Sequence, residues 1–390
     1  MTSAAYRDAA VPLAGLWSSP FARWGGTLAH TPSVDLAAVT TDRALRRRGI
    51  DRRAVEGLVL GWTVPQPAVF YGATTLASRL GLPGVGGPMV SQACATSVAA
   101  LHLAAASVAA GAGCQLVVTT DRVSNGPDLT WPAPGGSGRE PVRENWVRDS
   151  FARDPVTGLS MLATAEAVAA ECGFTRGDLD ALAVLRSEQY AAAADRRDGY
   201  LIGVDDGASV RLRADEGVRP VTADGAARLH TVRLGGTHTA AAQTHPADGT
   251  AGALVATARQ ARELADGPVL RLLASGFARV APARMPKALV PAARAALDAA
   301  GLGFDALDAI GTHNPFAVND LYFAQQTGVA LDAMNTLGSS LVHGHPQAPT
   351  GLRAVTELAH ALRARGGGRG LFTGCAAGDT AAALVVQLTD

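Results

Sequence analysis

A cysteine placed for nucleophilic chemistry occurs at residue 94. Cys94 lies in the run SQACATS, after an apolar strand expected at residues 88–91 and just before a long apolar helix that begins near Ser97. The macrodipole and the free backbone N–H groups at the N-terminus of a helix favour the thiolate form of a nearby thiol. Cys94 is therefore a candidate nucleophile. The alternative is a small buried apolar residue, which is the common role of a single cysteine.

Three further residues with suitable chemistry follow in the second half of the chain. His345, in the run HGHP, comes directly before a second long helix. Cys375 follows a strand expected at residues 371–374, and His313 ends another strand. In α/β folds the carboxyl ends of strands gather catalytic side chains at one edge of the sheet. We therefore expect these side chains to share a surface with Cys94, and His345 to act as its base.

The elements that position these residues repeat along the chain. The segment around Gly49 has a counterpart around Gly301, 252 residues later, and a helix, glycine turn and strand near Gly111 recur 255 residues later near Gly366. Apolar strands alternate with helical stretches in both halves, for example at residues 58–61, 88–91 and 116–120. Two near-equal spacings indicate duplicated βαβ units. They predict an α/β fold with two related halves, parallel sheets, and helices packed on the sheet faces.

The middle of the chain, residues 121–246, has no counterpart in the second half. It contains two helical stretches, at residues 164–172 and 178–194, and the run WPAPGGSGREP at residues 131–141. An insertion of this length on a compact scaffold is typical of a binding or lid subdomain. The predicted organisation is therefore an N-terminal half at 1–120 and 247–262, an inserted domain at 121–246, and a C-terminal half at 263–390.

Composition and charge restrict the class of protein. The chain has 390 residues, of which 48% are hydrophobic and 17% charged, so it can bury a large core and is not intrinsically disordered. Lys plus Arg and Asp plus Glu both number 34, which gives no electrostatic footprint for nucleic acid or an anionic membrane. Four cysteines without a CxxC pair argue against a disulfide scaffold or a structural zinc site. With no signal peptide or membrane-spanning run expected, we predict a cytoplasmic protein.

Four motifs resemble the signatures of the thiolase superfamily. QACATSVAA is similar to the nucleophile loop, HNPFA to the loop usually written NEAF or HEAF, GHP to the histidine loop, and GCAAG to the second-cysteine loop. Supporting stretches such as RMPKALVPAARAALDAAG extend the resemblance over almost the whole chain. The resemblance implies an α/β thiolase-like fold. In that fold two duplicated βαβ halves make five αβαβα layers, and the insert is a CoA-binding loop domain.

The resemblance also implies a role for each motif residue. Cys94 would attack an acyl-CoA thioester to form an acyl-enzyme, and His345 would accept the thiol proton. Cys375 would be the acid/base at the α-carbon of the second substrate, in Claisen condensation or in thiolysis. One oxyanion hole would consist of His345 and a water held by His313. The backbone N–H groups of Cys94 and Ala377 would form the other.

Positions that contact coenzyme A are carried over in the same way. Arg219, in the run DEGVR, matches the arginine that stacks on adenine, and Thr244 matches the serine that hydrogen-bonds pantetheine. Further CoA-binding or substrate-binding positions match Ser160, Met161, Met285 and Phe316. The implied substrates and partners are acyl-CoA and CoA, with no further cofactor and no metal. A homodimer that pairs through an edge strand is also implied.

Departures from the family pattern leave two alternatives open. His313 stands where many biosynthetic thiolases have Asn, Ala377 where CxG would place Gly, and Ser160 where short-chain enzymes have His. The histidine indicates a longer or branched acyl chain. One alternative is a condensing enzyme of the ketoacyl-synthase III kind, which has no cysteine at the position of Cys375. The other is a repurposed, non-catalytic thiolase-like binding protein. The acyl class depends on a pocket that we expect residues 131–141 to shape.

Overall fold

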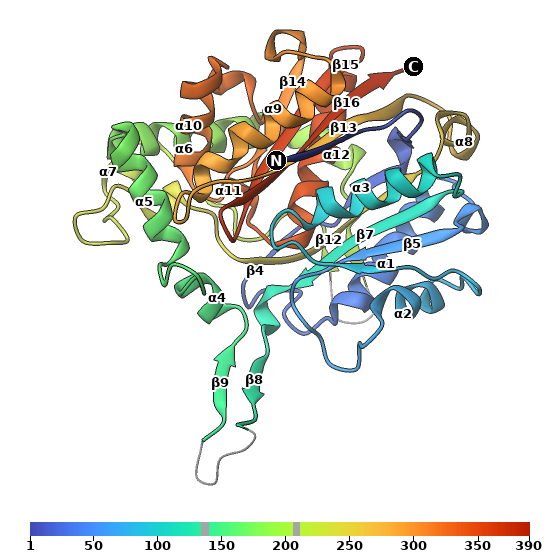
Figure 1. Ribbon diagram of the computed structural model, residues 1–390, viewed down its shortest axis with the longest axis horizontal. Helices are drawn as coiled ribbons and strands as arrows, with labels where there is room; N and C mark the ends of the chain where they lie inside the picture. The colour runs from blue at the N-terminus through green and yellow to red at the C-terminus, as the bar shows by residue number, and fades with distance from the viewer. Residues whose placement is uncertain (134–139, 206–210) are drawn as a thin grey trace.

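Two sheets that share a three-strand core organise the chain (Figure 1). The computed structural model describes residues 1–133, 140–205 and 211–390. The first sheet has the order β3-β12-β7-β5-β6, and β4 also pairs with β12. Its strands are β3 (Leu16–Ser18), β4 (Ala22–Arg23), β5 (Gly57–Gly61), β6 (Met89–Val90), β7 (Gln115–Arg122) and β12 (Ala247–Val255).

The second sheet has the order β1-β13-β16-β15-β14, and β2 also pairs with β13. Its strands β16-β15-β14 repeat the pairing directions of β12-β7-β5 in the first sheet. Its strands are β1 (Thr2–Ala5), β2 (Ala10–Pro12), β13 (Val269–Arg279), β14 (Ala309–His313), β15 (Gly368–Ala376) and β16 (Thr380–Thr389). Both β7 and β15 have one parallel neighbour (β5, β14) and one antiparallel neighbour (β12, β16). The matched glycines Gly49 and Gly301 each follow a helix with a positive φ, 67° and 68°. This shared plan confirms the duplication.

The prediction of parallel sheets was wrong in part, because both sheets are mixed. Parallel pairing is confined to β5 with β6 and β7, and to β14 with β15, among the described strand pairs. The link from β15 to β16 explains the difference in the second sheet. It consists of residues 377–379 alone, and so short a connection joins antiparallel strands, whereas a parallel pair needs a crossover of a dozen or more residues.

Helices cover and separate the sheets in five αβαβα layers, as the resemblance implies. The middle layer consists of α3 (Thr96–Ala109) and α12 (Ala348–Ala364), whose apolar side chains pack on residues of both sheets, such as Val117 and Phe372. The outer face of the first sheet is covered by α1 (Ser33–Arg47) and α2 (Gly72–Arg79). The outer face of the second is covered by α9 (Leu289–Ala300) and α10 (Ala317–Thr327). Two short helices, α8 (Ala258–Leu264) and α11 (Ser340–His343), lie in connecting segments.

The insert leaves the first sheet after β7 and returns to it at β12. A hairpin of β8 (Asp128–Trp131) and β9 (Val142–Asn145) projects from the body of the molecule (Figure 1). The elements that follow are α4 (Arg148–Ala152), α5 (Met161–Cys172), α6 (Arg176–Ala192), the pair β10 (Val204–Asp205) and β11 (Arg211–Leu212), and α7 (Ala223–Ala227). The helices α5 and α6 confirm the two predicted helical stretches. Residues 134–139, part of the run expected to shape the acyl pocket, lie outside the described residues.

The first residues of the chain belong to the second sheet. β1 and β2 pair with β13, so residues 2–12 cross to the C-terminal half although the sequence placed them in the N-terminal half. The other proposed domain limits stay a prediction. Within the three described ranges, no helix is both long enough and apolar enough to cross a membrane.

Candidate active site

Cys94 lies in a tight turn between β6 and α3. The preceding residue, Ala93, has a φ of 45°, in the left-handed region that L-residues seldom adopt. The hydroxyl of Thr96 closes the turn, because it donates to the carbonyl oxygen of Ala93 (2.6 Å) and accepts from the N–H of Gln92 (2.8 Å). Since α3 begins at Thr96, the thiol stands at the N-terminus of a helix that the two sheets enclose.

His345 is hydrogen-bonded to Cys94. Its Nε2 lies 3.0 Å from the Cys94 sulfur, and its Nδ1 lies 2.6 Å from Oγ1 of Thr350, in the first turn of α12. Burial raises the pKa of the Cys94 thiol to about 12 and lowers the pKa of the His345 imidazole to about 3. Thiol and imidazole are therefore both neutral at rest. A nucleophilic attack by the sulfur requires transfer of its proton to Nε2.

His313 stacks beside His345 at the end of β14. The two ring centroids are 4.2 Å apart and the ring planes are inclined by 36°. Nδ1 of His313 lies 2.7 Å from Oγ of Ser340, whereas its buried Nε2 has no hydrogen-bond partner among the described residues. Burial, then the neighbouring imidazoles of His345 and His343, hold the pKa of His313 well below its ordinary value. A neutral imidazole with a free nitrogen in a buried site is suited to bind a water or a developing oxyanion.

Cys375 brings a second thiol to this place from the other sheet. It is fully buried in β15, and its sulfur accepts a hydrogen bond from Nδ2 of Asn319 (3.2 Å). Burial, followed by the neighbouring Cys94 thiol, raises the pKa of Cys375 well above its ordinary value. Just beyond β15, the backbone of Ala377 lies close enough to lower the pKa of the Cys94 thiol, against the larger effect of burial. Two sulfurs and two imidazoles therefore converge where the two halves meet.

The same side chains form a set of metal-ligand types. The sulfur of Cys94 and one nitrogen each of His313 and His345 lie within 4.8 Å of one another. Thiolate and imidazole are zinc ligands. However, the bond between Cys94 and His345 already pairs a proton donor with an acceptor, and the set contains no carboxylate. The expectation of no metal stays a prediction.

Asp121 ties the loops of both halves together. It lies fully buried at the end of β7, and its carboxylate accepts hydrogen bonds from the N–H groups of Thr63 (2.8 Å), Val64 (2.9 Å) and Ala348 (2.9 Å). Burial raises the pKa of Asp121 to about 7, against the effect of these bonds. Because Ala348 begins α12, this carboxylate fixes a loop of the first half to the helix that follows His345.

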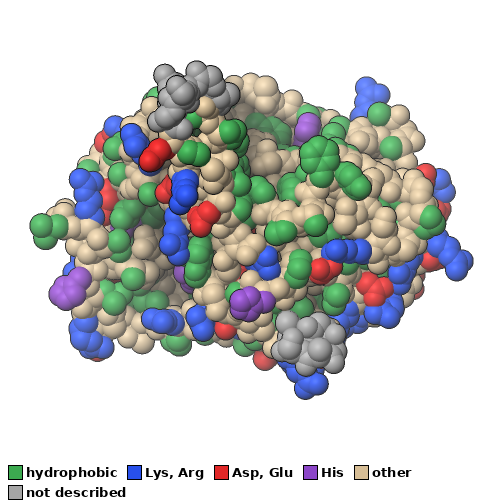
Figure 2. Space-filling model, turned by 90° about the horizontal axis from the view of Figure 1, so that it is seen from below, with side chains coloured by type: hydrophobic (Ala, Val, Ile, Leu, Met, Phe, Trp, Pro, Cys, Tyr) green, Lys and Arg blue, Asp and Glu red, His purple; other side chains and the backbone are tan. Residues whose placement is uncertain are grey.

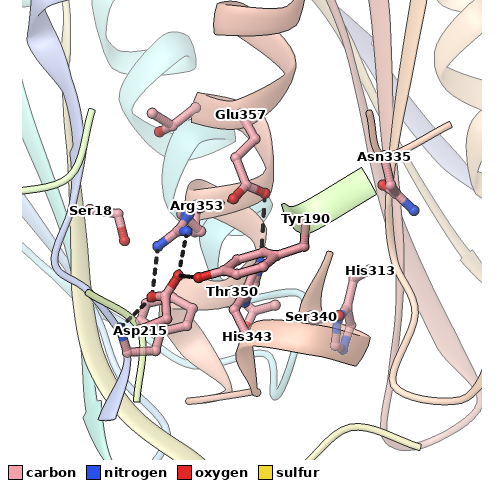
Figure 3. A network of polar contacts seen from close by, with 12 residues as sticks. Ser18, Tyr190, Asp215, His313, Asn335, Ser340, His343, Thr350, Arg353 and Glu357 are labelled. Carbon is pink, nitrogen blue, oxygen red and sulfur yellow. Dashed lines mark hydrogen bonds and ion pairs between the residues drawn. The ribbon is translucent and has the colours of Figure 1, made fainter. Parts of the chain in front are cut away.

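We call residues 343–347 the histidine loop. A buried polar network contacts this loop through His343 (Figure 3). Arg353 of α12 pairs with Asp215 (3.0 Å) and with Glu357 (2.7 Å). Tyr190 of α6 donates to Asp215 (2.9 Å), and Nε2 of His343 lies 3.6 Å from the Glu357 carboxylate. Asp215 and Tyr190 belong to the insert. The network therefore joins the insert to α12 and to the histidine loop.

Three of the residues that the family resemblance assigns to coenzyme A binding contact other residues of the protein. Ser160 caps α5 by accepting from the N–H of Ala163 (3.2 Å). Thr244 donates its hydroxyl to the carbonyl oxygen of Ser340 (2.5 Å), and its own N–H is bound to a carbonyl as well. Met285 is buried in the core under the second sheet. These contacts give each residue a structural role beside any role in binding.

The other three residues assigned to coenzyme A binding differ in how far they are exposed. Phe316 is buried beside α10 and meets the ring of His238 edge-on, with ring centroids 5.6 Å apart. Met161 is half-buried at the start of α5, and Arg219 is exposed between β11 and α7. Figure 2 shows basic and acidic side chains interspersed on one face rather than gathered by sign. An anionic ligand would therefore be held by individual arginines rather than by a broad positive field.

The sequence reasoning missed the residues that orient the four chemical groups: Ser340, Thr350, Asn319 and Asp121. Thr350 stands five residues after His345, and Ser340 stands three before the run HGHP. At such short distances from a catalytic candidate, a hydroxyl is a reasonable partner for the second ring nitrogen of a histidine. No comparable signal points to Asn319 or Asp121, since their partners come from distant segments.

Comparison with known proteins identifies the family. The model described as "Thiolase, N-terminal domain" matches residues 13–259, and "Thiolase, C-terminal domain" matches residues 268–388. The chain belongs to the thiolase family. It is 31% identical to the 3-ketoacyl-CoA thiolase of Serratia proteamaculans over 95% of both chains. It is 28% identical to the acetyl-CoA acetyltransferase of Chromobacterium violaceum, over 93% of this chain and 96% of the other.

The solved structure of human mitochondrial 3-ketoacyl-CoA thiolase in complex with CoA has the same fold. Its TM-score to this thiolase is 0.91, with 22% sequence identity and all of both chains covered. Family and fold together show an enzyme of the thiolase acyltransferase type, which acts on CoA thioesters.

Proposed function

We propose that this thiolase makes or cleaves a 3-ketoacyl-CoA through an acyl-enzyme on Cys94, with Cys375 as acid and base. The observation that carries the proposal is the 3.0 Å contact between the Cys94 sulfur and Nε2 of His345, in a site that also holds the thiol of Cys375. A two-step acyl transfer needs a nucleophile hydrogen-bonded to a neutral base, here Cys94 and His345. It also needs a second titratable group nearby, here Cys375.

In the first step the Cys94 sulfur attacks the thioester carbonyl while its proton passes to Nε2 of His345. The new C–S bond forms, and the carbonyl electrons move to the oxygen, which the N–H groups of Cys94 and Ala377 stabilise; one such donor is worth about 3 kcal/mol. The C–S bond to coenzyme A then breaks. The departing thiolate takes the proton from the His345 imidazolium, so coenzyme A leaves as the thiol and His345 is neutral again.

In the second step the Cys375 thiol gives its proton to the neutral imidazole of His345, and the resulting thiolate removes an α-proton from another acyl-CoA. The S–H bond forms, and the electron pair moves into an enolate whose oxygen is held by His345 and by a water on His313. The enolate carbon attacks the acyl group on Cys94, so a C–C bond forms and the C–S bond breaks. The Cys94 sulfur then takes the proton back from Nε2 of His345, which restores the starting thiol and imidazole. Thiolysis is the same sequence in reverse, and metabolite ratios decide the direction.

We further propose that the insert, residues 121–246, binds coenzyme A, with Arg219 on the adenine and Thr244, Ser160 and Met161 along the pantetheine. Met285 and Phe316 of the C-terminal half would complete the wall around the pantetheine and acyl groups. The polar network of Figure 3, which ties this insert to the histidine loop, supports a substrate-binding role for the insert. A cytoplasmic location and the absence of a resident cofactor are parts of the same proposal.

A homodimer is the proposed assembly. The edge strand β6 has β5 as its neighbour in the described part of the sheet, and Phe70 and Tyr71 beside it are 92% and 68% exposed. An open strand edge next to exposed aromatic side chains is typical of a surface that another chain covers.

The experiment is intact-protein mass spectrometry after brief exposure to acyl-CoAs from acetyl to long and branched chains. The wild-type protein should gain the mass of one acyl group, and the best donor would define the acyl class. Cys94→Ser should abolish the adduct. The matched control Cys172→Ser, at a thiol in α5 outside the site, should keep it. Wild-type protein that no acyl-CoA labels would overturn the proposal, and would leave a carrier-dependent condensing enzyme or a non-catalytic thiolase fold.

A further inference from the structure

Asn319 holds the sulfur of Cys375 from the third position of α10. The side chain is fully buried. Its Oδ1 accepts a hydrogen bond from the N–H of Phe316 (3.3 Å), and its Nδ2 donates to the Cys375 sulfur (3.2 Å). A backbone N–H can only donate, so the contact with Phe316 fixes which end of the amide is the oxygen. The group that faces the sulfur is therefore an N–H donor.

The surroundings of Cys375 otherwise oppose a negative charge on its sulfur. Burial raises the pKa of Cys375 most, and the thiol of Cys94 and the carboxylate of Asp320 raise it further. The Asn319 amide and the backbone N–H of Cys375 itself lower it. The carboxylate of Asp320 is compensated in part by the buried guanidinium of Arg186 (2.8 Å).

The two thiols of the site differ in their partners. Cys94 has the imidazole of His345, which can take its proton. The side-chain partner of Cys375 is an amide N–H, which cannot accept a proton but can stabilise a sulfur that has lost one. Other titratable groups near Cys375 are Cys94 on the loop before α3, Asp320 on α10, and His313, which lies on β14 opposite Gly374 in the strand register.

We propose that Asn319 is a positioning residue for Cys375, whose Nδ2–H directs the sulfur and stabilises the thiolate that removes the α-proton of the second acyl-CoA. The inference rests on the proposed function and deepens it. It assigns Asn319 to the carbon–carbon bond-forming half of the reaction and leaves acylation of Cys94 to His345. In the step concerned, the substrate C–H bond breaks, an S–H bond forms on Cys375, and the electron pair moves to the enolate oxygen.

Asn319→Asp is the sharpest variant. Aspartate has nearly the same size and keeps an oxygen to accept the N–H of Phe316, so the start of α10 is preserved. It replaces the donor at the sulfur by a carboxylate oxygen, whose charge opposes a neighbouring thiolate. Asn319→Leu removes the donor without adding a charge, and it carries the test if the aspartate variant does not fold. Gln326→Glu is the matched control, because it makes the same amide-to-acid change at an exposed position of the same helix.

The experiment measures both halves of the reaction in each variant as a function of pH. Acyl-enzyme formation on Cys94 is followed by rapid-quench mass spectrometry, and α-proton removal by deuterium uptake into acyl-CoA in D₂O. A hydrogen bond to a charged group is worth enough to change a rate roughly 10- to 100-fold. We expect exchange and condensation to fall by that factor in Asn319→Leu and by more in Asn319→Asp, and their pH profiles to move upward by about one unit or more. Acylation should be unchanged, and Gln326→Glu should behave as wild type.

Two results would overturn the inference while the proposed function stands. The first result is that the wild-type protein forms the acyl-enzyme and condenses, but the Asn319 variants exchange the α-proton at the wild-type rate. The other is an equal loss of acylation and exchange with an unmoved pH profile, which is what a purely structural role of Asn319 would give. A wild-type protein that forms no acyl-enzyme would instead remove the proposed function itself.

Discussion

Replacing Arg353 by leucine should destabilise the protein strongly at neutral pH. The guanidinium is fully buried and is bonded to the carboxylates of Asp215 and Glu357 at 3.0 and 2.7 Å. Leucine would leave two buried carboxylates without this cation. A buried charge without a partner is costly, and breaking such a pair typically costs about 3–5 kcal/mol.

The lowered pKa of Glu357 gives a second measure of the stability that Arg353 contributes. Burial by itself would raise the pKa of this carboxyl, but the charge of Arg353, aided by His343, lowers it to about 2 from an ordinary value of 4.5. A shift of this size corresponds to about 3 kcal/mol of stability. Because the pKa in the folded state lies below that in the unfolded state, this stabilisation is complete above about pH 4.5 and is lost as the pH falls toward 2.

The assay is urea unfolding of wild type, Arg353→Leu and the control Arg363→Leu, an exposed arginine of the same helix. At pH 7 we expect Arg353→Leu to lose about 3 kcal/mol or more. The control should stay within about 0.5 kcal/mol of wild type. Below pH 4.5 the deficit of Arg353→Leu should narrow, since the orphaned carboxylates take up protons. A variant as stable as the control at pH 7, or a deficit that does not narrow in acid, would refute the reasoning.

Three further predictions concern the site. Thr350→Val removes the hydroxyl that hydrogen-bonds Nδ1 of His345, so acylation of Cys94 should slow roughly 10-fold or more. Thr350→Ser keeps the hydroxyl and should acylate at nearly the wild-type rate, as measured by quenched-flow mass spectrometry. Equal acylation rates in the two variants would contradict the positioning of His345 by Thr350. With the pKa of His345 lowered to about 3, the imidazole stays neutral and ready to accept a proton above about pH 4, so the acylation rate should show no inflection near the ordinary imidazole pKa of about 6.5. Gly344 has a φ of 91°, and a Cβ there would lie 2.6 Å from Cε1 of His245. Gly344→Ala should therefore displace the histidine loop and lower both the melting temperature and the acylation rate. A variant with an unchanged melting temperature and acylation rate would contradict this expectation.

The positions of the four chemical groups were predictable from the sequence because each marks the end of an element. Cys94 precedes the start of a long apolar helix, and His313 ends a short apolar strand, patterns that local periodicity reveals. The repeat with spacings of 252 and 255 residues predicted that the two halves share one plan. The antiparallel direction of β16 was missed, although the three-residue link after β15 already favours it.

The contacts that orient these groups could not be predicted, because they join segments far apart in the chain. Asp215 meets Arg353 across 138 residues, and Asp121 meets the N–H of Ala348 across 227. Neither pair stands out by residue type or spacing. Such contacts depend on how the five layers settle on one another, which helix and strand periodicity does not specify.

The central claim is that Cys94 carries the acyl group while Cys375 handles the α-proton, and Cys375→Ala tests it most directly. The measurement is rapid-quench mass spectrometry of this variant, first with the best acyl-CoA donor and then after addition of a second acyl-CoA. The account predicts that an acyl group accumulates on Cys94 and stays there, without a 3-ketoacyl-CoA product. Turnover at the wild-type rate, or an acyl group found on a residue other than Cys94 in the wild-type protein, would contradict it.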